Sequence, residues 1–218
     1  MSDIILEAKG LTMRFGGLTA VKEFNATIPR GSICGLIGPN GAGKTTCFNM
    51  ITGFYKPTEG QVFFQGEELT GRPPYLVCKA GVARTFQNIR LFGNETVLEN
   101  VMIGGHLRQK TGWLSAVLCL PAHFREERAM RARALELLDT VGLAHLAGET
   151  ASSLPYGAQR RLEIARALAT QPSFLLLDEP AAGMNPQETQ DLMQFIRNIR
   201  EQFGLTVELV RICFPYIL

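Results

Sequence analysis

The sequence predicts an α/β fold built on a mostly parallel central sheet. Strand-like apolar runs alternate with longer helix-like segments, which is the pattern of parallel strands joined by crossover helices. The run Ile33–Ile37 is continuously apolar, as expected of a strand that is buried on both faces. A mainly helical stretch from about Leu91 to Ala151 interrupts this alternation. It predicts a helical subdomain inserted into the sheet-based core.

The first third of the chain is strand-like. Ile4–Ala8 is short and apolar, and Phe24–Ile28 places its apolar residues on one side. The apolar run that follows ends in a glycine-rich loop, and a helix is expected from about Lys44. Gln61–Phe64 is expected to form a further short strand.

The helical stretch is followed by a return to alternation. Arg125–Val141 carries a single apolar face on an otherwise charged segment, which predicts an amphipathic helix. The elements expected after it are helix Ala158–Thr170, strand Phe174–Leu177, helix Gln187–Phe203 and strand Leu205–Val210. Strands separated by helices in this way favour a parallel arrangement.

Composition excludes several classes of protein. The 218 residues allow one large domain, or one domain with a smaller insert, and 46% hydrophobic residues exclude general disorder. A net charge of +2 gives no reason to expect nucleic acid or an anionic membrane as the main partner. The apolar run Trp113–Leu120 is far shorter than the ~20 residues that cross a bilayer, and the N-terminus does not have the pattern of a secretory signal. The five cysteines have no CxxC spacing and are expected to be free thiols in a reducing cytosol.

The strongest motif is a glycine-rich loop between a strand and a helix. Residues 38–45 read GPNGAGKT and fit the phosphate-loop pattern GxxxxGK[ST]. The glycines let backbone N–H groups turn toward phosphate oxygens, and the start of the helix adds unpaired donors and the positive end of its dipole. Lys44 is expected to reach the β- and γ-phosphates, and the Thr45 hydroxyl to coordinate Mg²⁺.

Two carboxylates follow a second apolar strand. Asp178 and Glu179 come directly after Phe174–Leu177. At the tip of a parallel strand, Asp178 is expected to hold Mg²⁺ through water, and Glu179 to act as the base that activates the attacking water. Adjacent acids are weak evidence alone, but together with the phosphate loop they predict a nucleoside triphosphatase.

From about Ile4 to Val207, the sequence resembles the nucleotide-binding subunits of ATP-binding cassette (ABC) transporters. The motifs occur in the family's order: GPNGAGKTT at 38–46, Thr85-Phe86-Gln87 at the glutamine loop, LPYGA at 154–158 in place of the LSGGQ signature, LLLDEP at 175–180 and AGMN at 182–185. The resemblance implies a P-loop NTPase fold with an N-terminal antiparallel β subdomain and an inserted α-helical subdomain at about 91–157. Residues 1–207 would form the ABC ATPase domain.

The resemblance also implies which residues form the site. Glu179, Gln87 and Lys44 would be catalytic, and Thr45, Gln87 and Asp178 would hold Mg²⁺. ATP would be bound by Phe15, which stacks on adenine, and by Val21, Gly38, Pro39, Asn40, Gly41, Ala42, Gly43, Lys44, Thr45, Thr46, Leu154, Tyr156 and Gly157.

The expected partners follow from the same resemblance. Two subunits would dimerise head to tail, as a homodimer or with a paralogous ATPase, so that each ATP lies between one phosphate loop and the other signature helix. ATP would join the subunits and hydrolysis would release them. The dimer would drive transmembrane permease subunits served by a periplasmic or extracellular substrate-binding protein, peripherally at the cytoplasmic face of the inner or plasma membrane. The resemblance implies no nucleic-acid partner.

Finer features resemble one branch, the branched-chain amino acid importer ATPases of the LivG type. They are MRFGGLTAV at 13–21, TGFYKPTEG at 52–60, RTFQNIRLF at 84–92, YGAQRRLEIARAL at 156–168 and DEPAAGMNP at 178–186. ATPases of urea or amide importers and of lipopolysaccharide exporters are similar and remain alternatives.

The signature is degenerate. Pro155 stands where the family has serine, Tyr156 replaces the first glycine and Ala158 replaces the glutamine. Loss of the serine hydroxyl removes one donor to the partner's γ-phosphate, so signature function is expected to be weakened but present. Arg160 and Arg161 follow the signature and are expected either to face the phosphates or to be exposed.

A larger departure lies after Val207. The family's γ-phosphate histidine is expected near Ile212, but no histidine follows His145, and Glu208 interrupts a strand expected to be buried. Residues 208–218 are therefore expected to be an aberrant or truncated tail, from a frameshift or assembly error, although a genuine shortened variant or a functional tail stays possible. Without the histidine, hydrolysis is expected to be at least about tenfold slower than in an intact relative.

Four functions remain in competition. The first is a transport ATPase, and the second is a nucleotide-binding product with little or no turnover. The third is an ABC ATPase of DNA repair or translation, which the single phosphate loop and the missing long heptad run disfavour. The fourth is a nucleotide kinase, which the glutamine loop and LLLDEP together disfavour.

The apolar run Trp113–Leu120 is expected either to contact a membrane subunit or to pack on the helical insert.

Overall fold

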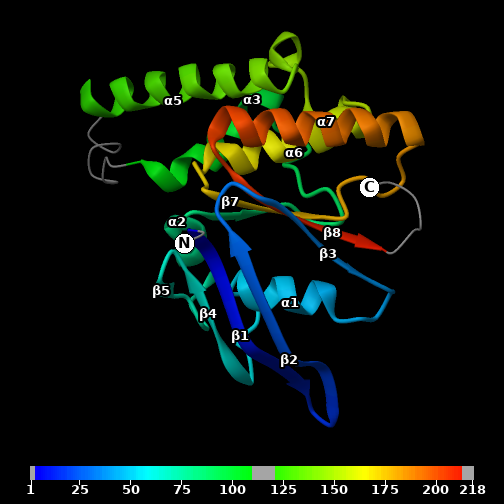
Figure 1. The fold of residues 1–218 in the computed structure, drawn as a ribbon. Coiled ribbons are helices and arrows are strands. Elements are labelled where there is room, and N and C mark those ends of the chain that lie inside the picture. The colour runs from blue at the N-terminus through cyan, green and yellow to red at the C-terminus, as the bar shows by residue number, and fades with distance from the viewer. Residues whose placement is uncertain (1–2, 110–120, 213–218) are drawn as a thin grey trace.

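The computed structural model describes residues 3–109 and 121–212. Within those ranges the chain has a mixed α/β fold with one parallel and one antiparallel sheet, which confirms the predicted fold class (Figure 1). No helix in the described ranges combines the length and apolarity needed to cross a bilayer. The predicted apolar patch Trp113–Leu120 lies outside the described residues.

The antiparallel sheet holds the N-terminal strands in the order β2-β1-β4-β5. Their bounds are β1 Ile4–Phe15, β2 Leu18–Pro29, β4 Glu59–Phe64 and β5 Glu67–Glu68. β1 runs past the predicted end at Ala8 because Gly10, at φ 57°, lies in a register shift and buried Leu11 continues the apolar face. The glycine is therefore a bulge within the strand, which the sequence pattern alone does not distinguish from a strand end.

The parallel sheet has the order β3-β8-β7-β6. Its strands are β3 Ile33–Gly38, β6 Val82–Arg84, β7 Phe174–Asp178 and β8 Thr206–Ile212. β6 has only three residues and no pattern of its own, so the sequence did not predict it. β8 pairs with both β3 and β7, and its Glu208–Ile212 segment is part of this sheet.

The helices begin with recognisable capping residues in two cases. Their bounds are α1 Lys44–Ile51, α2 Pro74–Ala80, α3 Val97–Gly105, α5 Pro121–Thr140, α6 Tyr156–Ala169 and α7 Pro186–Phe203, with short 3₁₀ turns at His106–Arg108, Ala144–Leu146 and Ala151–Ser153. Thr96 and Glu99 form a capping box at α3, and Asn185 and Glu188 form another at α7. The segment predicted to be helical, from about 91 to 151, contains α3, α5 and the first two of these turns, and the third turn begins at its end.

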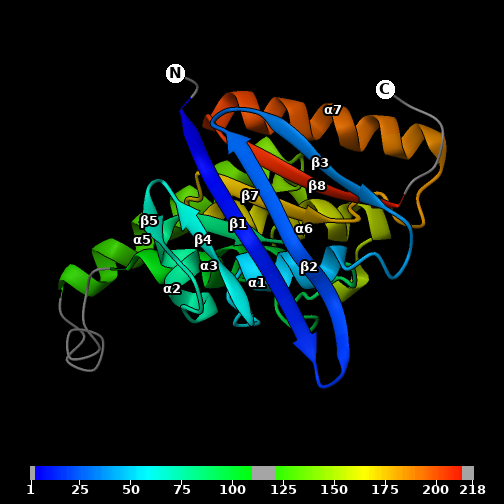
Figure 2. The same ribbon diagram turned by 60° about the horizontal axis from the view of Figure 1, so that its bottom comes forward.

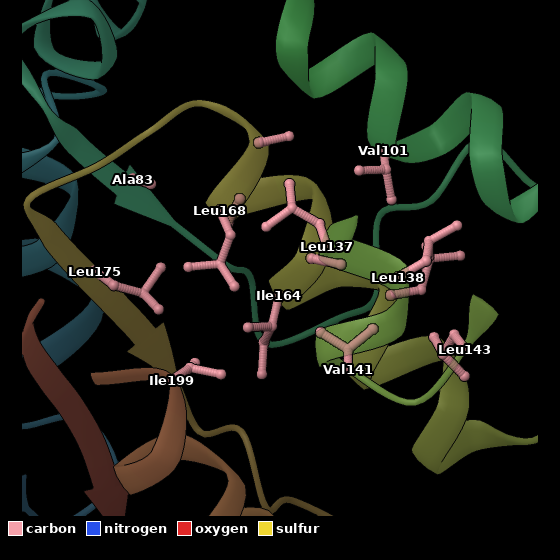
Figure 3. Close-up of a cluster of buried hydrophobic side chains, with 14 of the residues drawn as sticks. Ala83, Val101, Leu137, Leu138, Val141, Leu143, Ile164, Leu168, Leu175 and Ile199 are labelled. Atoms are coloured by element: carbon pink, nitrogen blue, oxygen red, sulfur yellow. The ribbon is translucent and has the colours of Figure 1, made fainter. Parts of the chain in front are cut away.

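Helices cover one face of the parallel sheet, and α1 lies on its other face, toward the antiparallel sheet (Figures 1 and 2). β7 has side chains in both cores, because successive residues of a strand point to opposite faces. Leu175 and Leu177 join the cluster made with α3, α5, α6 and α7, and Phe174 and Leu176 join the one made with α1, β1 and β4. The continuous apolar run of this strand is thereby explained. Figure 3 shows the helical cluster, in which Leu175 lies nearest to Leu168 and Ile164 of α6 and Ile199 of α7.

One carboxyl group lies inside the sheet. Glu208 of β8 is 4% exposed and lies opposite Cys34 of β3 and Leu176 of β7, and its Oε2 has no hydrogen-bond partner. Burial raises the pKa of Glu208 to about 7. Burial, and to a smaller extent the Glu208 charge, raises the pKa of the Cys47 thiol on α1 to about 11, so this thiol stays protonated at neutral pH.

Glu208 is expected to make the chain less stable as pH rises. Its pKa is about 7 in the folded chain against an ordinary 4.5, so protonation favours the folded state. The contribution is fully present below pH 4.5 and is lost as pH rises through 7, a difference of about 3 kcal/mol. Urea unfolding at pH 5 and pH 8 should show that Glu208→Gln removes most of this pH dependence. Glu201→Gln on α7, whose side chain is 69% exposed, is the control and should leave it in place.

Candidate functional site

The predicted site lies at the carboxyl edge of the parallel sheet. β3 ends at Gly38 and β7 ends at Asp178, and β8 separates the two strands. Neighbouring strands lie about 4.8 Å apart, so β3 and β7 are about 10 Å from each other across β8. Ligands of open α/β sheets bind at this edge, where loops leave the strands.

Two glycines of the phosphate loop are required by its conformation. Gly41 and Gly43 have φ values of 81° and 80°, in the region that favours glycine. A Cβ on Gly43 would also lie 2.7 Å from the Ala20 carbonyl oxygen and 2.8 Å from Val21 Cγ2. The loop is thus packed against β2, and Val21 lies beside it.

Lys44 lies inside the curve of the phosphate loop. Its Nζ donates hydrogen bonds to the carbonyl oxygens of Gly38 at 2.7 Å and Pro39 at 2.8 Å, and the residue is 7% exposed. Thr45 is exposed at the start of α1, and Thr46 is half-buried. Asn40 and the remaining loop residues Pro39, Gly41 and Ala42 are exposed as well.

The start of α1 can accept an anion. No side chain caps it, and its first turn has no acidic residue. The first N–H groups of a helix have no partner within the helix, and they carry the positive end of its dipole. Together with the Lys44 ammonium, this donor set fits the phosphates of a nucleotide.

The two predicted acids differ in their surroundings. Asp178 is 2% exposed, and its Oδ2 accepts a hydrogen bond from Arg84 Nη2 at 2.7 Å. Glu179 is half-buried and has φ 47°, a backbone conformation that few non-glycine residues adopt. Gln87 Nε2 donates to Glu179 Oε2 at 3.0 Å. The structure therefore brings together the glutamine and the carboxylate that are 92 residues apart in the chain.

Arg84 is a residue that the sequence analysis missed. Its side chain is 6% exposed, and besides Asp178 its guanidinium donates to Asn49 Oδ1 at 2.6 Å and Thr52 Oγ1 at 3.3 Å on and just after α1. It also lies over the ring of Phe86, at 5.1 Å from the centroid. The available signal was a charged residue at the end of the apolar pair Val82-Ala83, directly before the glutamine loop.

Phe15 and the signature residues lie in separate places. Phe15, 44% exposed, ends β1 and meets the Tyr55 ring edge-on at 5.5 Å. Tyr156 and Gly157 are exposed at the start of α6, but Leu154 is 6% exposed and belongs to the helical core. The Leu154 side chain is therefore buried in the core, and a ligand could be contacted by its backbone but not by its side chain.

Neither expectation for Arg160 holds. Arg160 is 2% exposed and forms an ion pair with Glu163, so it faces neither phosphates nor solvent. An amphipathic helix predicts its charged residues on the outer face, and a buried pair within one helix breaks that rule. Arg161 is half-buried, with its guanidinium over the Phe195 ring at 5.7 Å.

The predicted magnesium ligands are oxygen donors, as Mg²⁺ prefers. They are the Thr45 hydroxyl, the Gln87 amide oxygen and the Asp178 carboxylate, on the loops and strand ends described above. No group of three or more histidine, cysteine or acidic residues that could hold a metal ion is found in the described part of the chain. Oxygen donors of this kind fit an ion held jointly with phosphate oxygens, as in phosphoryl transfer.

A cavity of about 310 Å³ opens beside Glu179. The loop of residues 180–184 lines it, together with Met193 of α7 and Leu209 and Val210 of β8. Glu179 itself is one of the residues that line this cavity.

Comparison with known proteins agrees with this geometry. The ABC transporter family matches residues 21–182. The chain is 48% identical over 210 residues to the high-affinity branched-chain amino acid transport ATP-binding protein BraF of Pseudomonas aeruginosa, and 47% identical to LivG of Escherichia coli K12. Each alignment covers 96% of this chain and 82% of the relative.

A solved structure shows the same fold. The ADP conformation of an ATP-binding cassette of an ABC transporter superposes with a TM-score of 0.83 at 30% identity, over 97% of this chain and 82% of that chain. The chain belongs to the ABC transporter family, in which it is an ATP-binding cassette ATPase.

Proposed function

We propose that this chain hydrolyses ATP to drive an importer of branched-chain amino acids. The observation that carries the proposal is the hydrogen bond between Gln87 and Glu179, at the same sheet edge as the phosphate loop. The branch rests on the similarity to BraF and LivG, whose names state this transport. ATPases of urea, amide or lipopolysaccharide transporters are the alternatives within the same family.

ATP would bind along the phosphate loop. Phe15 would stack on adenine, and Val21 would support the loop beside the sugar and phosphates. Lys44 would exchange the carbonyls of Gly38 and Pro39 for the β- and γ-phosphate oxygens, because an ammonium group gains more from an anion than from a neutral carbonyl. Backbone N–H groups of residues 39–46 would hold the phosphates.

Hydrolysis would depend on two neighbouring side chains. Thr45, Asp178 and Gln87 would hold Mg²⁺, which when bound neutralises charge on the β- and γ-phosphates. Glu179 would take a proton from the attacking water, and Gln87 would hold that carboxylate in position through its 3.0 Å hydrogen bond.

A second subunit, a copy of this chain or a paralogue, would complete each site. The start of α6 has no side-chain cap and no acidic residue in its first turn, so its N–H groups can face a partner's γ-phosphate. Within residues 3–109 and 121–212 no hydrogen bond joins the signature residues 154–158 to the phosphate loop of the same chain. In the proposed assembly the signature of one subunit therefore faces the phosphate loop of the other in a head-to-tail dimer, which is bound to permease subunits at the cytoplasmic face of the membrane and supplied by a substrate-binding protein.

One observation favours a second function, nucleotide binding with slow turnover. By spacing, the γ-phosphate histidine of the resembling proteins is expected near position 212, and the end of β8 in this chain, Glu208–Ile212, contains no histidine. Loss of one transition-state contact worth ~1.4 kcal/mol slows hydrolysis tenfold.

The test is transport in membrane vesicles. The chain is supplied to vesicles that contain a branched-chain amino acid permease and its binding protein but lack their own ATPase subunits. ATP-dependent leucine uptake is expected, and Lys44→Ala should remove it, while Lys22→Ala at an exposed position should not. ATP binding without uptake or hydrolysis would favour the second function, and uptake of another substrate only would overturn the branch.

A further inference from the structure

Two buried charged residues of α6 hold the backbone of the glutamine loop, residues 85–87. Arg160 and Glu163 are each 2% exposed, and Arg160 Nη1 lies 2.9 Å from Glu163 Oε2. Nη1 donates to the Phe86 carbonyl oxygen at 2.7 Å, and Nη2 donates to the Gln87 carbonyl oxygen. The Phe86 N–H donates in turn to Glu163 Oε1 at 3.3 Å. The pair thus binds three backbone groups of the loop.

The last residue of the same loop, Gln87, contacts the proposed catalytic carboxylate of Glu179. The Gln87 side chain reaches Glu179, while its carbonyl is held by Arg160. Arg160 Nη2 also lies 3.3 Å from the Tyr156 hydroxyl, which donates to the Ala182 carbonyl at 3.2 Å in the loop after Glu179. One guanidinium therefore connects the start of the signature helix with loops on both sides of the Gln87–Glu179 hydrogen bond.

We infer that Arg160 and Glu163 are a positioning pair that orients the glutamine loop so that Gln87 meets Glu179. The pair touches neither nucleotide nor attacking water, and it acts only through Gln87. This inference rests on the proposed role of Glu179 as the base. It gives α6 a direct mechanical connection to the catalytic carboxylate within one subunit.

The chemistry of the pair suits positioning better than stability. Buried ion pairs often add little stability compared with apolar residues of similar size, and here Arg160 Nε has no hydrogen-bond partner. The planar guanidinium can donate to two carbonyls and a carboxylate in fixed directions, which a lysine ammonium cannot reproduce. Arginine is thus required at position 160 to direct these hydrogen bonds, and a positive charge on a lysine would not be enough.

The first test measures hydrogen exchange at the glutamine loop. The double variant Arg160→Met/Glu163→Met removes both charges together, so no buried charge is left without a partner. Exchange of the Phe86 amide is expected to rise at least about tenfold, because its acceptor is gone, while helix α7 keeps the protection of the parent. Arg128→Met, at an exposed position of α5, is the control and should leave the loop unchanged. Unchanged protection of Phe86 in the double variant would overturn the inference.

The second test separates turnover from binding. The double variant and Arg160→Lys are expected to lower kcat about tenfold or more, while the dissociation constant for ATP changes less than about threefold. A kcat within about twofold of the parent in both variants, or an equal loss of ATP affinity, would overturn the inference. Glu179→Gln in the same assay tests the proposed function separately. If it leaves hydrolysis intact, the proposed function fails, and the exchange experiment still decides whether the pair holds the loop.

Discussion

Glu179→Gln is expected to lower ATP hydrolysis by about 100-fold or more and to leave ATP affinity within about threefold of the parent. The substituted amide oxygen can still accept the hydrogen bond from Gln87 Nε2, so the loop geometry is kept. What is lost is a group that can accept a proton from water, because an amide is not a base at neutral pH. The substitution therefore removes the ability of residue 179 to accept a proton while keeping its side chain in the same position.

The measurement is single-turnover hydrolysis beside equilibrium binding of ATP. Because hydrolysis would release the dimer, Glu179→Gln should also accumulate an ATP-bound dimer, detectable by light scattering. Glu201→Gln on the outer face of α7 is the matched control and should hydrolyse ATP at the parental rate. Hydrolysis by Glu179→Gln at more than about one-third of the parental rate would show that another group activates the water.

The fold class and the phosphate loop could be predicted from the sequence because their signals are local. The apolar run of β3, the glycines at 41 and 43, and Lys44 lie within a dozen residues, and the structure shows the positive φ values that glycine readily adopts. The same holds for LLLDEP, where Asp178 ends a strand buried on both faces. Local pattern and three-dimensional position agree at these places.

The sequence could not predict which charged residues are buried. Arg84 meets Asp178 across 94 residues, and Arg160 meets the glutamine loop across more than 70. Such contacts depend on how β6, β7 and α6 pack, and no periodicity within one segment encodes them. The bulge at Gly10 and the short strand β6 were missed for the same reason, because their pairing partners decide them. For Arg160, the local sequence did contain one indication of a pair, because Glu163 follows it by three residues on the same helix.

Arg84→Met is expected to lower the free energy of unfolding by about 3–5 kcal/mol. The substitution leaves Asp178, with a side chain that is 3% exposed, without the cation that pairs with it at 2.7 Å. It also removes the donors to Asn49 and Thr52 that tie β6 to α1. A buried carboxylate that loses its partner pays the cost of desolvation without compensation, which is why the effect should exceed that of a surface pair.

The chain contains a matched control for this experiment. Arg30 and Asp3 are also 2.7 Å apart, but their side chains are 40% and 71% exposed. Arg30→Met should therefore cost no more than about 1 kcal/mol in the same urea titration. If burial decides the strength of the pair, Arg84→Met/Asp178→Asn should recover part of the lost stability, because no unpaired charge remains, yet it should bind ATP without the Mg²⁺ dependence of the parent. Equal losses for Arg84→Met and Arg30→Met would instead show that Asp178 finds another partner, and that Arg84 does not hold the proposed magnesium carboxylate in place.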